Sequence, residues 1–194
     1  MVRPLVMCGP SGVGKGTLIN KLLEKYPTVF GKKVSHTTRL PRAGEINGVS
    51  YHFTSKKNFE FDTKQGAFLE TAMVHGNYYA TSKKAVEDVA AQGKICVLEL
   101  DAQGVESIRA TKLNPHFIFV FPPTFETLEQ RLRKRGSETE DSIQTRLTTA
   151  RKELKWMKEC NFLHHKVVCI NPEIGLSSLE DVLFNRCYPQ FAKL

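Results

Sequence analysis

A glycine-rich turn close to the N-terminus constrains this chain more than any other stretch. The turn has the sequence GPSGVGKGT, from Gly9 to Thr17, and it follows the apolar run 5–8. Gly9, Gly14 and Lys15 match the G-x-x-x-x-G-K phosphate loop, in which backbone N–H groups curl around a phosphate and lysine adds positive charge. A helical pattern begins directly afterwards, and its N-terminal dipole favours anions. The order of strand, turn, lysine and helix therefore predicts a nucleotide-binding site rather than an αβ turn that binds nothing.

The residues that this pattern assigns to the nucleotide phosphates form one continuous loop. They are Gly9, Ser11, Gly12, Val13, Gly14, Lys15, Gly16 and Thr17. In the common pattern a serine or threonine follows the lysine directly, whereas here Gly16 follows it and the Thr17 hydroxyl comes one position later.

The chain's charge indicates what kind of partner to expect. Over 194 residues the formal net charge is +8, which favours anionic partners such as nucleotides, nucleic acid or acidic membrane surfaces without choosing among them. Hydrophobic residues make up 41%, as in an ordinary globular domain, and no apolar run approaches the roughly 18 residues of a membrane span. We therefore expect a single domain that does not bind a membrane.

The cysteines and the N-terminus together predict a cytoplasmic protein. Five cysteines are scattered through mostly apolar runs, and their spacing to histidines fits no common zinc pattern, so we expect buried free thiols. The first predicted strand begins almost at residue 1, and so we expect no signal or transit peptide.

Alternating apolar strands and helices predict an α/β fold with a parallel sheet covered by helices. Continuous apolar runs predict buried strands at 5–8, 95–100, 117–121 and 166–170. Between them, periodic patterns predict helices at 18–26, 82–91, 105–112, 124–135, 143–157 and 176–187, with Ser137 as a capping residue. Residues 36–82 break this alternation, with strands expected near 33–36, 50–54, 68–74 and 77–80 and a helix at 56–64. This segment reads as an α+β insertion.

Two arginines and several hydroxyls gather in a proline-punctuated segment, residues 35–51. Ser35, Arg39, Arg42 and Tyr51 could bind a phosphate, because the planar guanidinium suits bidentate phosphate contacts. By itself the segment fits a solvated basic loop equally well.

Motifs along nearly the whole chain resemble those of the guanylate kinases. They are SHTTR-x-PR (35–42), GV-x-Y-x-F (48–53), F-x-E (68–70), HGNYY (75–79), LELD-x-QGV (98–105) and RL-x-x-RG-x-ET (131–139). The resemblance implies a P-loop nucleoside monophosphate kinase that transfers the γ-phosphoryl group of ATP to GMP, and also to dGMP, giving GDP and ADP. It also implies Mg²⁺ as cofactor, a role in purine nucleotide metabolism, and a single domain that we expect to be a monomer.

The resemblance also divides the chain into functional parts. It places the core at 1–34, 83–130 and 147–194, a GMP-binding lobe at 35–82 and a lid at 131–146. The residues that it implies for the GMP phosphate are Ser35, Arg39, Arg42, Tyr51 and Tyr79, and those for guanine are Glu70, Thr81 and Asp101.

Hydrogen-bonding chemistry agrees with guanine as the base. A carboxylate such as that of Glu70 can accept from N1–H and the exocyclic amine together, and the Thr81 hydroxyl can donate to O6. Adenine would leave the carboxylate facing a lone pair, and an unpaired buried polar group costs roughly 1–3 kcal/mol. Sites of this kind reject analogues by factors on the order of 10⁴.

The remaining implied residues serve ATP and the transferred group. Catalysis is assigned to the cations Lys15, Arg39, Arg42, Arg131, Arg135 and Arg146, which would neutralise two polyanions, while Arg133 and Lys134 are expected to be solvent charges. Asn171 corresponds to the adenine contact, although Pro172 and Glu173 depart from the family's pattern, and Thr17 is the expected protein ligand of Mg²⁺. Thr71, Ala80 and Glu99 also depart from the family's usual residues.

Three other functions fit parts of the sequence. Guanylate-kinase-like domains also serve as inactive scaffolds that bind phosphopeptides, but Gly14, Lys15 and the lid arginines are intact here. A nucleic-acid-binding NTPase would need an acidic motif or an aromatic-interleaved basic stripe that the chain lacks. Glu70 and Thr81 argue against a kinase for another nucleoside monophosphate. We therefore expect ATP and GMP as partners and no nucleic acid.

Overall fold

A computed structural model describes residues 2–42, 44–74, 76–134, 139–162 and 165–192. Internal packing divides the chain into two compact units. The first consists of Met1–Pro4, Pro27–Leu98 and Gln103–Pro115, and the second of Leu5–Tyr26, Glu99–Ala102 and His116–Leu194. The first unit is larger than the predicted lobe 35–82, because neighbouring strands and helices pack with it. The predicted boundaries of core, lobe and lid stay a prediction.

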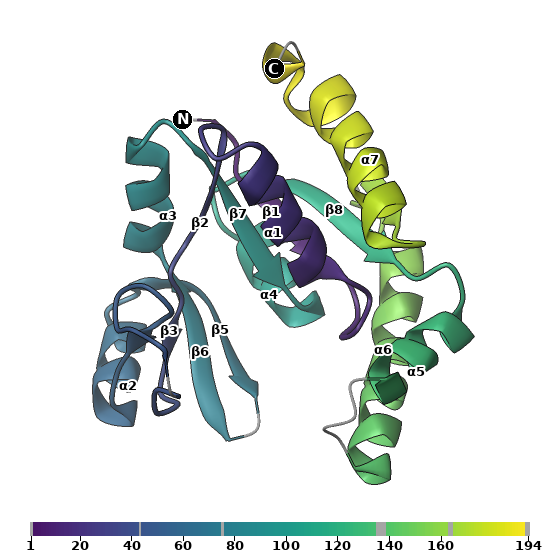
Figure 1. Cartoon of the computed structure of the whole chain (residues 1–194). Helices are drawn as coiled ribbons and strands as arrows, with labels where there is room; N and C mark the ends of the chain where they lie inside the picture. Colours follow the sequence, from purple (N-terminus) through teal and green to yellow (C-terminus); the bar gives the residue numbers. More distant parts are fainter. Residues whose placement is uncertain (1, 43, 75, 135–138, 163–164, 193–194) are drawn as a thin grey trace. The chain divides into compact units, whose positions relative to one another are not determined.

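A four-stranded sheet and three helices make up most of the first unit. The sheet has the order β4-β3-β6-β5, formed by β4 (His52–Phe53), β3 (His36–Thr37), β6 (Asn77–Ser82) and β5 (Phe68–Val74). β2 (Phe30–Lys32) and β7 (Ile95–Leu100) are parallel neighbours and belong to the other sheet, which has the order β2-β7-β1-β8-β9. The helices are α2 (Lys56–Lys64), α3 (Lys83–Ala91) and α4 (Ala102–Arg109). Antiparallel β5 and β6 lie side by side in Figure 1.

Local sequence explains why these elements begin where they do. The hydroxyls of Ser55 and Ser82 accept hydrogen bonds from backbone N–H groups in the first turns of α2 and α3. On α2, the buried Phe59 ring stacks on Tyr78 of β6 at 5.2 Å and lies 4.9 Å from Phe68 of β5. This aromatic cluster fastens α2 to the sheet.

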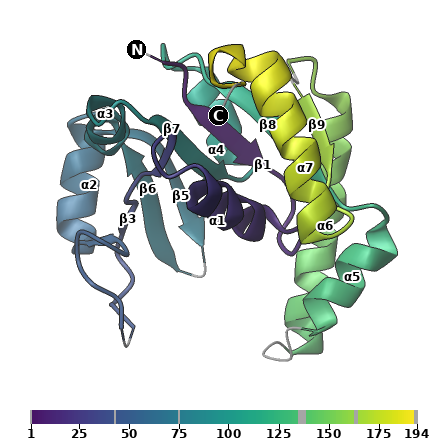
Figure 2. The same ribbon diagram turned by 45° about the horizontal axis from the view of Figure 1, so that its top comes forward.

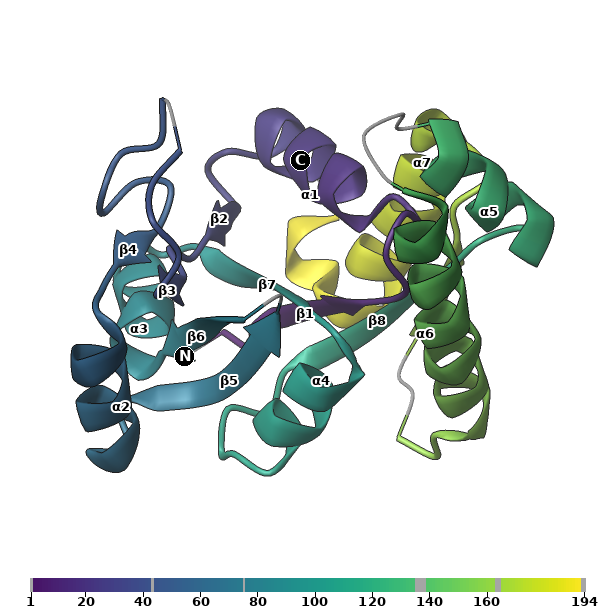
Figure 3. The same cartoon turned by 90° about the horizontal axis from the view of Figure 1, so that it is seen from below.

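Three parallel strands form the centre of the second unit. β1 (Leu5–Cys8) pairs with β8 (His116–Phe121), and β8 pairs with β9 (His165–Val168), as Figure 2 shows. The helices of this unit are α1 (Lys15–Lys25), α5 (Phe125–Lys134), α6 (Glu140–Glu159) and α7 (Pro172–Val182), followed by a π-helical turn (Leu183–Cys187) and a 3-10 turn (Pro189–Phe191). The α5 and α6 helices lie side by side in Figure 3.

Helices cover both faces of β8 and β9. Phe119 packs against Trp156 of α6 at 5.6 Å, so this face of β8 belongs to α6. On β9 side chains alternate between faces. Cys169, just beyond β9, lies on the face opposite to α6. Its sulfur lies 3.2 Å from where a Cβ on Gly175 of α7 would be, so α7 covers that opposite face. The predicted burial is thus confirmed for β8, whereas on β9 Val167 is buried and Lys166 and Val168 are exposed.

The predicted fold class is confirmed, but several element boundaries differ. The strand expected at 33–36 is split into β2 and β3, with the buried Lys33 between them. The last helix begins at Pro172 rather than 176, because Asn171 caps it. Thr139 caps α6, whereas the predicted cap Ser137 lies outside the described residues. Among the described helices, none is both long and apolar enough to cross a membrane.

Candidate active site

The phosphate loop of the second unit depends on glycine for close packing. A Cβ on Gly9 would lie 2.4 Å from the carbonyl oxygen of Val120 in β8, which is shorter than any tolerated contact. Gly14 has φ 109° and caps α1, a conformation that side-chain-bearing residues avoid. The loop can therefore lie directly on the strand and turn into α1.

Three cations of the predicted set contact this loop, and two of them, Lys15 and Arg146, lie on its first half. The Lys15 ammonium donates to the carbonyl oxygens of Gly9 at 2.5 Å and Pro10 at 3.2 Å, and so it is held across the loop. The half-buried Arg146 of α6 donates from Nη1 to the Ser11 hydroxyl at 3.2 Å. Lys15 and Arg146 are thus brought to the same loop from positions 131 residues apart in the sequence.

Arg131 has a structural role that its sequence position did not reveal. Its guanidinium donates to three backbone carbonyls: Val13 of the loop at 3.1 Å, Cys169 at 2.9 Å and Ile170 at 2.7 Å. It therefore ties α5 to the phosphate loop and to the end of β9. Its predicted contact with the ATP phosphates stays a prediction. Arg135 lies outside the described residues.

Acidic groups near α1 could hold a hydrated divalent cation. The Glu99 Oε2 atom lies 3.9 Å from where a Cβ on Gly16 would be, and Glu99, Asp101 and Thr17 are all exposed. No cluster of three or more histidine, cysteine or acidic ligands occurs within the described ranges. Mg²⁺ usually binds one or two carboxylates together with water and substrate phosphates, so these residues fit that ion without a cage of protein ligands.

Glu153 of α6 is an acidic neighbour of Lys15 that sequence reasoning missed. Burial raises the pKa of the Glu153 carboxyl, the positive charge of Lys15 opposes this shift, and Asp101 adds to it. Burial likewise raises the pKa of the Cys8 thiol to about 12, with Lys15 again opposing. Glu153 lies two helical turns from Arg146 on the same face of α6, and this spacing is the only signal that could have indicated it.

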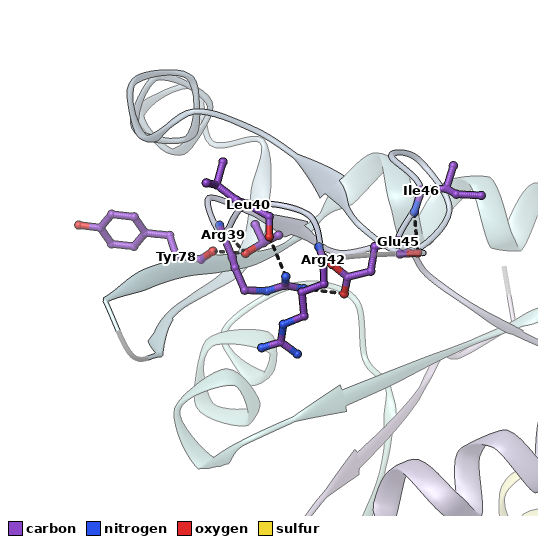
Figure 4. A network of polar contacts seen from close by, with 8 residues as sticks. Arg39, Leu40, Arg42, Glu45, Ile46 and Tyr78 are labelled. Atoms are coloured by element: carbon purple, nitrogen blue, oxygen red, sulfur yellow. Dashed lines mark hydrogen bonds and ion pairs between the residues drawn. The ribbon is translucent and has the colours of Figure 1, made fainter. Parts of the chain in front are cut away.

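The predicted phosphate-binding arginines of the first unit are organised by Glu45, which was not predicted (Figure 4). The Arg39 guanidinium donates to Glu45 Oε1 and to the Leu40 carbonyl, both at 2.7 Å. Glu45 Oε2 accepts from the backbone N–H of Arg42 at 2.7 Å. In Figure 4 the Arg42 guanidinium extends away from this network.

Aromatic rings support the same arginine. The Arg39 guanidinium carbon lies 5.4 Å from the Tyr51 ring centroid, and the Tyr51 and Tyr79 rings are 6.0 Å apart. The Glu45 carboxylate, followed by a hydrogen bond with Tyr79, raises the pKa of Arg39, and Arg39 with the Arg42 N–H lowers the pKa of Glu45. The structure therefore brings Arg39, Tyr51 and Tyr79 together, and their contact with the GMP phosphate stays a prediction.

Glu70 and Thr81 form a buried pair across β5 and β6. They are partners in the strand register, next to an irregularity between Phe68 and Glu70, and the Thr81 hydroxyl donates to Glu70 Oε1 at 2.5 Å. Glu70 is 8% exposed and Thr81 0%, so both groups depend on specific hydrogen-bond partners. A carboxylate in such a place can distinguish donors from acceptors on a ligand.

The other predicted residues have different surroundings. The Ser35 hydroxyl accepts from the buried Lys33 ammonium, a partner that was not predicted. Asp101 belongs to the second unit, whereas Glu70 and Thr81 belong to the first. The Asn171 side chain accepts from the Ile174 N–H at 2.8 Å, which gives it a capping role besides the predicted adenine contact.

Comparisons with known proteins agree with one another. A family model described as guanylate kinase matches residues 1–186. The chain is 52% identical to "Guanylate kinase 1" of Oryza sativa subsp. japonica over 93% of its length, and 47% identical to "Guanylate kinase" of Homo sapiens over 92%. It covers 89% of the human protein. The crystal structure of guanylate kinase from Anaplasma phagocytophilum superposes with a TM-score of 0.70 at 28% identity, covering 96% of this chain and 86% of that one.

Among these relatives the plant proteins are much longer. The chain spans 47% of the rice protein and 40% of "Guanylate kinase 1" from Arabidopsis thaliana, to which it is 55% identical over 79% of its own length.

Proposed function

Because this chain belongs to the guanylate kinase family, we propose that it transfers the γ-phosphoryl group of ATP to GMP, giving GDP and ADP. The observation that carries the proposal is the buried Glu70 carboxylate, which offers the acceptor that the guanine N1–H and amine need, with the Thr81 hydroxyl beside it to turn from Glu70 to the guanine O6. The phosphate loop supports ATP as the donor. A cytoplasmic location and a monomeric state remain predictions.

The protein's part in the transfer is alignment and charge neutralisation. A phosphate oxygen of GMP is already an anion, so it can attack the γ-phosphorus without a general base. The main obstacle is repulsion between two polyanions, and Lys15, Arg146 and Arg39 would offset it. Glu45 orients Arg39, so the guanidinium meets the GMP phosphate from a defined position.

The acidic residues Glu99 and Asp101, together with Thr17, fit a hydrated Mg²⁺ ion. Glu99 and Asp101 would hold the ion's water shell and Thr17 offers a hydroxyl, although the sequence predicted Thr17 alone. When bound, Mg²⁺ neutralises charge on the β- and γ-phosphate oxygens.

A coupled assay tests the activity and its acceptor. The intact chain is supplied with ATP and Mg²⁺ and, in turn, GMP, dGMP, AMP and UMP. We expect turnover with GMP and dGMP, and rates lower by factors on the order of 10⁴ with AMP, because AMP offers the Glu70 carboxylate neither the N1–H nor the 2-amino group of guanine. Turnover with AMP or UMP at the GMP rate, or with none of the four, would contradict the proposal.

Glu70→Gln tests whether this carboxylate reads the base. The amide cannot accept two N–H groups, so we expect kcat/KM for GMP to fall by about 10²-fold or more, with KM for ATP unchanged. Glu60→Gln on exposed α2 is the matched control and should leave both values as they are. An equal loss in both variants would remove Glu70 from guanine recognition.

A further inference from the structure

A groove on the second unit lies apart from every residue assigned above to ATP, GMP or Mg²⁺. It has a volume of about 640 Å³ and is lined by the end of β8, the start of α5, the second half of α6 and β9. This volume falls within the roughly 300–1,000 Å³ of sites that bind small molecules.

The apolar lining of the groove consists largely of flat groups. Phe121 and Phe125 contribute rings, with Pro122 and Pro123 between them in the sequence, and Leu154 of α6 adds an aliphatic surface. Flat apolar faces of this kind suit the planar base of a nucleotide, because every base has a face that can stack without hydrogen-bond selection.

The charged lining of the groove is entirely cationic, and Thr124 is the one uncharged polar residue among the residues that line it. Arg151, Lys155 and Lys158 follow one another along α6 at i, i+4 and i+7, and Lys166 joins them from β9, while no aspartate or glutamate lines the groove. By the helical rise, the three α6 cations form a row about 10 Å long. A row of this length matches a linear polyphosphate better than a single phosphate or carboxylate.

The contacts of these cations leave most of their charge uncompensated. The Arg151 guanidinium lies 4.5 Å from the Phe125 ring and the Lys166 ammonium 5.8 Å from the Phe121 ring, contacts that orient a cation without neutralising it. The Lys155 ammonium lies 3.9 Å from the Glu159 carboxylate, and both side chains are exposed, so this pair is weak.

We propose that this groove binds a nucleoside polyphosphate, in addition to the one that the phosphate loop holds. The base lies against Pro122, Pro123 and Leu154, beside the Phe121 and Phe125 rings that Lys166 and Arg151 approach, and the polyphosphate follows the α6 cations. This is a binding site and not a second catalytic centre, since no residue of the proposed transfer lines it.

Binding stoichiometry tests the proposal independently of turnover. Equilibrium dialysis of the intact chain with labelled ATP should give two ATP per chain, and the double variant Lys158→Glu/Lys166→Glu should give one. Lys152→Glu, exposed on the same helix but outside the groove, should keep two. One ATP per chain in the unaltered protein, or two in the double variant, would overturn the proposal. Unchanged circular dichroism and turnover in the double variant show that it folds.

Competition identifies the chemistry that the groove recognises. Inorganic tripolyphosphate should displace the second ATP more weakly than ADP does, because it lacks a base for the apolar faces. Equal displacement would overturn the nucleoside part of the proposal, and tighter displacement by a peptide of alternating glutamate and phenylalanine would reassign the groove to an acidic peptide. Trp156, the single tryptophan, adjoins Lys155 on α6, so its fluorescence should report occupancy of the groove in the unaltered chain and not in the double variant.

Discussion

At the scale of single residues, a departure from the common phosphate-loop pattern, Gly16, lies near Glu99, which departs from the family's usual residue. Gly16 brings no hydroxyl directly after Lys15, and among the described residues outside its own helix turn the Glu99 carboxylate oxygen lies 3.9 Å from its hypothetical Cβ. Glutamate is one methylene longer than the aspartate usual in the family, so its carboxylate reaches further. Glu99 can therefore support the water shell of Mg²⁺ where a loop hydroxyl is missing.

Glu99→Gln should raise the Mg²⁺ concentration needed for tight ATP binding by about 10-fold or more, the usual cost of losing a residue that supports a metal's ligands. Isothermal titration of ATP at several Mg²⁺ concentrations measures this without relying on activity. Adding Gly16→Ser to that variant should restore part of the Mg²⁺ dependence, since the space there is open. If Thr17→Val changes the Mg²⁺ dependence and Glu99→Gln does not, the ion depends on Thr17 as the sequence predicted.

Arg131 and Arg146 should differ in what they contribute, although the sequence assigns both to catalysis. Arg131→Ala removes hydrogen bonds to three backbone carbonyls, and we expect a loss of about 1–3 kcal/mol in the free energy of unfolding. Arg146→Ala removes an exposed contact with the Ser11 hydroxyl, so stability should fall less than in Arg131→Ala while turnover falls by about 10³-fold or more. Urea unfolding and the coupled assay together separate the two roles. Arg146→Ala with near-normal turnover would take Arg146 out of the mechanism.

At the scale of elements, α5 and α6 are fastened to each other by charge as well as by apolar packing. Leu132 of α5 packs with Ile143 and Leu147 of α6. Arg133, predicted to be a solvent charge, is exposed, and its guanidinium also makes a bidentate pair with Glu140 at 2.6 and 2.9 Å and contacts Glu129. The pair spans the ends of two helices, which an isolated helix cannot show.

The Arg133–Glu140 pair should make stability depend on acidic pH. Arg133, followed by Gln144, lowers the pKa of Glu140 from 4.5 to about 2. A lowered folded-state pKa means that the stabilisation is complete above pH 4.5 and is lost as the pH falls towards 2. At pH 7 we expect Glu140→Gln to unfold at a lower urea concentration than the unaltered chain. This difference should shrink as the pH falls from 4.5 to about 2. Glu159→Gln, which breaks an exposed pair within α6, is the control; a pH-independent difference for Glu140→Gln would contradict the assignment.

At the scale of the whole molecule, burial should make the thiols a measure of folding. Four of the five cysteines are buried and Cys160 is half-buried. Burial raises the pKa of Cys8 and of Cys96 to about 12, so both remain protonated thiols near neutral pH.

A thiol-reactive dye at pH 8 should therefore label Cys160 first, and the other four only as fast as the chain unfolds. Cys160→Ser should abolish the fast phase and leave the slow phase unchanged. In urea all five should react together. Fast labelling of more than one thiol in the folded chain would show that a buried strand opens more readily than its packing indicates.

The sequence by itself determined the features that depend on local order. Strand, glycine turn, Lys15 and helix follow one another within a few residues, so the phosphate loop and the α/β alternation could be read directly. The motifs around Arg39 and Glu70 were predicted by resemblance to a family, and their chemistry could then be checked against guanine.

Only the tertiary structure decided what each of these side chains contacts. Arg131 meets the Val13 carbonyl 118 residues away, and Glu153 comes near Lys15 from the far end of the chain. Asn171 caps a helix that sequence periodicity placed several residues too late. The groove with Lys166 joins four elements that have no common motif. Such contacts depend on how strands and helices pack. A sequence pattern shows the periodicity of one helix or strand, but it does not show which other element packs against it.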